Sequence, residues 1–268
     1  MQILIDNNTH LQEQLVKATD FDDLNELKTA LLKIITEYIT TIELPIEKVD
    51  KVIIADHKSF GQVIPDYKTP IKFDICFSKY PILFAFNTKL NKVEYGKSII
   101  YHELQHCKEI NITDQKVDIN QIDNPPNYSL TEHYLYFGYH QWSEYYAYYH
   151  SSFTYPANIK GIEKFPNILR DIEVFKQNKP YRGETKYDWH YQNNIEPFVR
   201  NAVILVAHFK SGIDSQAKIV LQDFISLDAN MKTYFDRLVK VFDEFYQNYP
   251  NNVSYTNFIN IGKTLLTF

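Results

Sequence analysis

Apolar residues recur at helical spacing in one long segment near the N-terminus. From Asp20, the run "DFDDLNELKTALLKIITEYITTI" places leucine, isoleucine and tyrosine three or four residues apart, with acidic residues in its first turn. This pattern predicts an amphipathic helix that ends near Leu44-Pro45. Three short segments that follow are rich in β-branched or aromatic residues and are separated by prolines. They predict the strands of a small sheet, at 51–56, 72–78 and 82–87.

A helix is predicted from about Val93 to Ile110, directly after this strand-like region. A polar loop with two prolines follows, and Ser129 can then cap a second long helix. Glu132, three residues after Ser129, would complete a capping box. Further helices are predicted over 194–210 and 216–248.

The polar and aromatic stretch 176–194 is typical of a long surface loop. Together these patterns indicate an α+β fold with a small mixed sheet, followed by a mostly helical C-terminal part. We expect residues 1–155 to form one region and residues 156–268 to form a helical region packed on it.

Composition narrows the possible partners. The chain is 44% hydrophobic and 23% charged, with a net charge of −5 and no block of lysine or arginine, which argues against nucleic acid. Two isolated cysteines favour a reducing compartment. No signal peptide is visible, and no apolar run approaches the roughly 18 residues that a membrane span needs. We therefore expect a cytoplasmic protein without a membrane partner, and the oligomeric state stays open.

The segment "SIIYHELQHCKEI" (98–110) carries the strongest chemical signal in the chain. His102 and His106 are four residues apart, so on a helix their imidazoles share one face and can bind one ion. Glu103 is rotated by about 100° from His102 and could reach a water on that ion without binding the ion itself. Zinc suits two imidazoles and one further donor, and would make the water acidic enough for Glu103 to deprotonate.

Chance alone would produce this motif in roughly one chain in sixty of this composition. Its neighbours Ile99, Ile100, Leu104 and Cys107 are uncharged, as a buried helix requires. Cys107 is therefore interpreted as a small buried hydrophobe. The alternative to a metal site is a solvated histidine–glutamate face, or core histidines held by hydrogen bonds.

The second helix offers a third ligand. His133, His140 and Glu144 recur on one helical face, and any of them could reach the metal. Glu144 is favoured because a carboxylate completes a set of two histidines and one glutamate. His140, one turn earlier, is a candidate for supporting the ligands or contacting the substrate.

The sequence "HELQH" resembles the HExxH motif of the zincin metallopeptidases. The metzincin branch would need glycine and histidine where this chain has Glu109 and Ile112, so the resemblance is to the gluzincin branch. There a glutamate on a following helix is the third ligand, and Glu144 with Ala147 forms the ExxA pattern. The chain looks like the ImmA/IrrE-like peptidases of bacteria and their mobile elements, over about residues 20 to 152.

The resemblance implies a zincin-like fold, a zinc cofactor and a protein or peptide substrate. It also implies that a strand just before the HExxH helix, predicted at 82–87, forms the sheet edge and binds the substrate in extended form. A side chain that stabilises the tetrahedral oxyanion is expected as well. Candidates in the second helix are Tyr146, Tyr148 and His150, for which packing in a tyrosine-rich helix is the favoured alternative. Tyr187 and His190 in the 176–194 loop could close over a cleft and do the same work.

Two functions follow from these residues. The first is a zinc-dependent peptidase that cleaves an intracellular protein or peptide, with Glu103 as the general base. The alternative is a non-catalytic zincin-like metal-binding protein that acts as a binding or regulatory module. The presence of Glu103 favours the peptidase, because a structural metal site needs no base.

Overall fold

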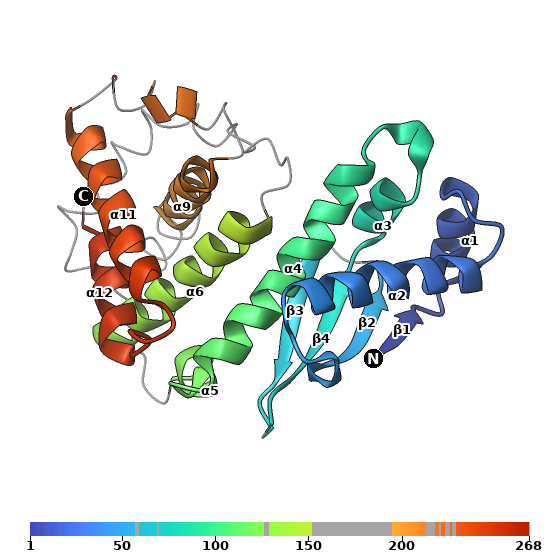
Figure 1. Ribbon diagram of the computed structural model, residues 1–268, viewed down its shortest axis with the longest axis horizontal. Coiled ribbons are helices and arrows are strands. Elements are labelled where there is room, and N and C mark those ends of the chain that lie inside the picture. Colours follow the sequence, from blue (N-terminus) through green and yellow to red (C-terminus); the bar gives the residue numbers. More distant parts are fainter. Residues whose placement is uncertain are drawn as a thin grey trace. The chain divides into compact units, whose positions relative to one another are not determined.

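The computed structural model describes residues 1–268 except 57–58, 69, 126–128, 152–194, 213–217, 220, 223–225, 227–228 and 268. The chain folds as two compact units (Figure 1). The first comprises residues 1–121 together with the end of α6 from His150, and the second comprises the rest of α6 and the C-terminal part. The elements in chain order are β1 (Gln2–Ile5), α1 (Thr9–Ala18), α2 (Leu24–Thr41), η1 (Ile46–Lys48), β2 (Val49–Ile54), β3 (Gly61–Asp66), β4 (Lys72–Phe77), α3 (Lys79–Ala85), η2 (Thr88–Leu90), α4 (Val93–Thr113), α5 (Ile119–Asp123), α6 (Leu130–Ser151), α9 (Glu196–Ser211), α11 (Ala229–Asn248) and α12 (Tyr255–Leu265).

The first unit contains a four-stranded mixed sheet in the order β1-β2-β4-β3. The strands β1, β2 and β4 run parallel, and β3 pairs with β4 in the antiparallel direction at one edge. The predicted α+β class, with a small mixed sheet and mostly helical remainder, is confirmed at this level. None of the helices in the described ranges is long and apolar enough to cross a membrane.

One face of this sheet forms the core of the first unit. Phe73, Ile75 and Phe77 of β4 are fully buried and alternate with Asp74 and Cys76, which are partly exposed. Because side chains alternate across a strand, all three apolar residues point to the same face. Figure 1 shows α2 and α4 lying along one face of the sheet, which explains this burial.

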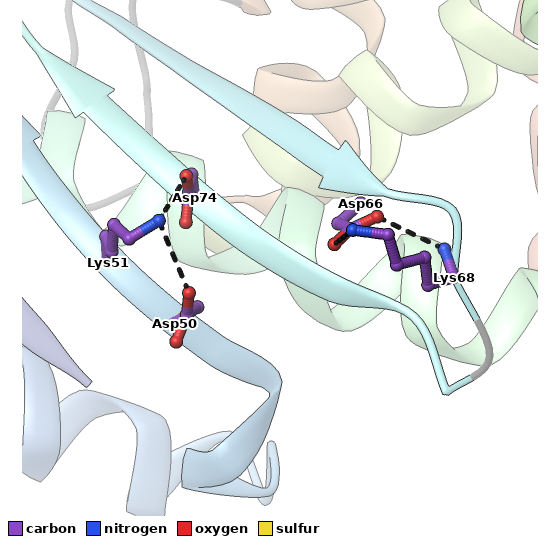
Figure 2. A network of polar contacts seen from close by, with 5 residues as sticks. All are labelled: Asp50, Lys51, Asp66, Lys68 and Asp74. Atoms are coloured by element: carbon purple, nitrogen blue, oxygen red, sulfur yellow. Dashed lines mark hydrogen bonds and ion pairs between the residues drawn. The ribbon is translucent and has the colours of Figure 1, made fainter.

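Charged residues show that the opposite face of the sheet meets solvent. Figure 2 shows Lys51 of β2 between Asp50 and Asp74, at 3.5 and 3.7 Å, and Lys68 beside Asp66, at 3.2 Å. The Lys51 side chain is 40% exposed. Exposed ion pairs of this kind add little stability, so these residues mark a solvated surface.

The predicted strand at 82–87 is wrong, because this segment belongs mainly to α3. Ser78 precedes the helix, and Pro81 lies in the first turn, where a missing N–H costs no helical hydrogen bond. The spacing of the buried residues also fits a helix: Ile82 and Ala85 are three residues apart, and Phe86 caps the helix. In a strand, buried residues would alternate with exposed ones.

The sheet edge is instead β3, which the sequence patterns did not predict. The segment "GQVIPD" contains Gly61 and Pro65, both of which weaken a strand prediction. Ser78 N–H donates to the carbonyl of Phe60 at 3.0 Å, which fixes the phase of the β3–β4 ladder. By alternation, the backbone of Pro65 points away from β4, so its missing N–H costs no bond in the sheet.

The two long helices with candidate site residues lie close to their predicted positions. The first, α4, extends one turn beyond its predicted end at Ile110. The predicted capping box at the start of α6 is confirmed: Glu132 N–H donates to Ser129 Oγ at 3.2 Å, and Ser129 N–H donates to Glu132 Oε2 at 2.7 Å. These local bonds explain why α6 begins at Leu130.

The second unit is built around aromatic side chains on α6 and α11. Trp142 is fully buried, with its ring centroid 4.5 Å from that of Phe245, and Tyr145 stacks on Phe242 at 4.5 Å. The helix α6 also approaches α12 closely: a Cβ at Gly138 would meet the carbonyl oxygen of Phe258. These contacts hold the helix that carries Glu144.

Candidate metal centre

Two histidine rings on α4 converge on one point. The apolar neighbours Ile99, Ile100 and Leu104 are buried, so the opposite side of the helix is left for His102 and His106, which are partly exposed. Their Nε2 atoms lie 3.0 Å apart. Two nitrogens bound to one tetrahedral zinc ion are separated by about 3.3 Å, so the pair is close to the spacing that a shared ion requires.

The helix α6 brings a carboxylate to these histidines. Its last turn belongs to the first unit, where Ser151 Oγ lies 3.5 Å from Nδ1 of His102. Glu144 lies two turns earlier on the same continuous helix. Each of His102, His106 and Glu144 offers one ligand atom, and these three atoms lie within 4.8 Å of one another. The group can hold a metal ion.

The chemistry of this group fits zinc. Two imidazole nitrogens and one carboxylate oxygen are a frequent set at catalytic zinc ions, whose fourth position is left to a water or substrate. All three side chains are half-buried, so the site is neither sealed in the core nor freely solvated. Within the described residues, His133 and His140 are not part of the group.

Glu103 follows His102 on α4 and faces the start of the edge strand β3. Its side chain is 7% exposed and rests against Gly61, where an added Cβ would be 2.5 Å from Glu103 Oε1. The carboxylate therefore occupies space that only a glycine at position 61 leaves open. This contact places Glu103, the predicted general base, next to the first residue of the edge strand β3.

Cys107 behaves as the sequence predicted. It is fully buried, and burial, with the nearby charge of Glu103 as a second cause, raises the pKa of its thiol well above the ordinary value. A buried thiol in that state stays protonated and unreactive. It packs as a small apolar residue.

His140 has two neighbours outside the metal group. Its Nε2 lies 2.9 Å from Asp123 Oδ1, and its ring centroid lies 4.1 Å from that of Tyr136. Although His140 lies one turn before Glu144, it is not one of the three residues of the metal group. The predicted role in supporting the ligands or contacting substrate stays a prediction.

The oxyanion candidates occupy different environments. Tyr146 is 4% exposed and packs against Tyr249, so it is a core residue. Tyr148 is partly exposed, with its ring centroid 5.6 Å from that of buried His208. His150 lies in the last turn of α6, where burial, helped by the charge of Lys108, lowers its pKa to about 4. Tyr187 and His190 lie outside the described residues.

Two residues that the sequence analysis missed contact the site side chains. Gly61 makes room for Glu103, and Arg200 of α9 donates from Nη2 to Glu144 Oε1 at 2.7 Å. Gly61 gives no local signal, because it is one of several glycines in irregular sequence. Arg200 does give one: it stands alone as a cation in the apolar run "PFVRNAVILVAHF".

No family model, curated protein or solved structure matches this chain. What this protein does has therefore to be inferred from the geometry of the metal group and from the position of Glu103. Both are properties of side chains rather than of the fold alone.

Proposed function

We propose that this protein is a zinc-dependent metallopeptidase of the gluzincin type, with a zincin-like fold. The observation that carries the proposal is the approach of His102, His106 and Glu144, whose ligand atoms lie within 4.8 Å of one another, with Glu103 alongside on the same helix as the histidines. The sheet below α4 and its antiparallel edge strand β3 support the fold assignment.

The residues divide the chemistry between them. When bound, the zinc ion supplies Lewis-acid polarisation of the scissile carbonyl and lowers the pKa of a water toward neutrality. His102, His106 and Glu144 would hold the ion. Glu103 takes a proton from the attacking water and returns it to the leaving amine, so the bond cleaved is the carbon–nitrogen bond of a peptide.

The edge of β3 supports a peptide as the substrate class. Backbone groups of Gly61, Val63 and Pro65 are directed away from β4, by the alternation of the ladder. The Gly61 carbonyl already accepts from Ser59 Oγ at 3.1 Å, whereas Val63 presents both an N–H and a carbonyl. An extended peptide would therefore pair with Val63 and pass the carboxylate of Glu103, which lies at Gly61.

Metal analysis and activity of matched variants test this proposal together. We expect about one zinc per chain in the purified protein and its loss in His106→Ala, because a site with two remaining ligands binds far more weakly. Glu103→Gln should keep zinc and lower peptide hydrolysis by about 10²- to 10⁴-fold, since the amide keeps the shape but cannot accept a proton.

The Glu103→Gln protein should also retain uncut substrate, which identifies peptides for the assay by capture and mass spectrometry. If the wild-type protein binds zinc but cleaves no captured peptide, the peptidase proposal is wrong and the non-catalytic metal-binding alternative takes its place. Full zinc occupancy in His106→Ala would show that His106 is not a ligand and would refute the proposed metal centre.

A further inference from the structure

The carboxylate of Glu144 has a second partner besides the histidines. Arg200 Nη2 donates to Glu144 Oε1 at 2.7 Å, which joins α9 to α6 within the second unit. The Glu144 side chain is 17% exposed and the Arg200 side chain is 53% exposed. The cation therefore covers a largely buried anion from its solvent side.

This ion pair and the metal group coexist in one structure. The ligand atoms of His102, His106 and Glu144 lie within 4.8 Å of one another while the bond to Arg200 is formed. A carboxylate has two oxygens and about four acceptor positions, so one N–H donor leaves room for a metal. Arg200 does not have to leave for an ion to bind.

The physical effect of such a donor is to fix the orientation of the ligand. Side chains that hydrogen-bond to a metal ligand restrict its rotamers, and their removal commonly costs about 10- to 100-fold in metal affinity. Glu144 needs this restriction more than the histidines do, because its side chain has three rotatable bonds and it is the one ligand outside α4.

We infer that Arg200 is a positioning residue that holds the Glu144 carboxylate for the metal ion. This inference rests on the proposed zinc site, but not on peptidase activity. It assigns a role to the C-terminal part of the chain, since α9 lies beyond the segments that carry the other site residues.

Metal affinity measured without substrate tests this role. Competition with a chromophoric chelator should show that Arg200→Met binds zinc about 10- to 100-fold more weakly than the wild type. Arg200→Lys should recover part of the affinity, because it keeps the charge but not the planar donor. The Co²⁺-loaded proteins add a spectroscopic readout: Arg200→Met should change the visible absorption, which reports the ligand geometry.

Lys210→Met is the matched control. It removes a second ion pair from the same helix, between Lys210 and Asp243 of α11 at 2.6 Å, and should leave zinc affinity and the Co²⁺ spectrum unchanged. An equal loss in this control would overturn the inference, because the effect would then be general destabilisation.

Tighter zinc binding by Arg200→Met would also overturn it, since Arg200 would then compete with the metal for Glu144. An unchanged affinity has the same consequence. If the wild type binds no zinc, the proposed function falls together with the inference. If the wild type binds zinc and Arg200→Met binds it with the same affinity, the inference is wrong while the proposed zinc site stands.

Discussion

Gly61→Ala should lower the proposed peptidase activity, because it displaces the proposed general base Glu103 without touching the proposed metal ligands. A Cβ at position 61 would lie 2.5 Å from Glu103 Oε1, whereas ordinary contacts begin at 3.4 Å, so the carboxylate has to move by about 0.9 Å (3.4 − 2.5). A misplacement of about 1 Å can cost on the order of 100-fold in rate. We therefore expect peptide hydrolysis to fall by about that factor.

The backbone gives no other reason for such a loss. Gly61 does not adopt the left-handed conformation that favours glycine, so alanine is compatible with the strand. Alanine restricts the unfolded chain, which favours the folded protein by about 0.4 to 1 kcal/mol and offsets the cost of moving the Glu103 side chain. Zinc content and the free energy of unfolding should therefore be maintained, and only the turnover number should fall.

The assay is hydrolysis of a quenched fluorescent peptide, measured beside zinc content and urea unfolding. Gln62→Ala is the matched control, because residue 62 is exposed and points to the opposite face of β3. In a double-mutant cycle, Gly61→Ala should have almost no further effect once Glu103→Gln is present, because both changes disable the same group. Full activity of Gly61→Ala, or additive effects in the cycle, would refute the assignment of Glu103 as the base at this position.

Two further predictions concern the end of α6 and the sheet edge. The pKa of His150 is about 4 in the folded protein against an ordinary 6.5, so the unfolded chain gains a proton first as the pH falls and the folded state loses stability. This loss is at most about 2 kcal/mol between about pH 7.5 and about pH 5. Urea unfolding should therefore depend less on pH in His150→Gln than in the wild type. An identical pH dependence in the variant would contradict the burial of this imidazole. Val63→Pro should raise the KM for the peptide substrate, because it deletes the N–H that is directed away from β4. Val63→Thr keeps this N–H and should leave KM unchanged. Equal KM values in the two variants would exclude pairing of the substrate at Val63.

Local patterns in the sequence determined the helices of the candidate site. The capping box of Ser129 and Glu132 and the four-residue spacing of His102 and His106 involve neighbours on one helix. Such neighbours meet whenever the helix forms, so their positions follow from periodicity alone. The pairing of Glu144 with this motif came from the chemistry of a set of two histidines and one glutamate and from the resemblance to gluzincins.

The strands were harder to predict because their stability depends on partners elsewhere in the chain. The segment 82–87 is apolar and short enough for a strand, and only its packing in the first unit selects the helix α3. The edge strand β3 carries Gly61 and Pro65, which oppose a strand by propensity; its pairing with β4 outweighs that preference.

Tertiary structure alone decided which residues surround the site side chains. Gly61 meets Glu103 from a different strand, and Arg200 reaches Glu144 across 56 residues of sequence. Neither contact has a periodic or spacing signal, because each depends on how separate elements pack rather than on how one element forms. The sequence by itself therefore determined the candidate ligands and the base, while the packing of separate elements determined what holds them in position.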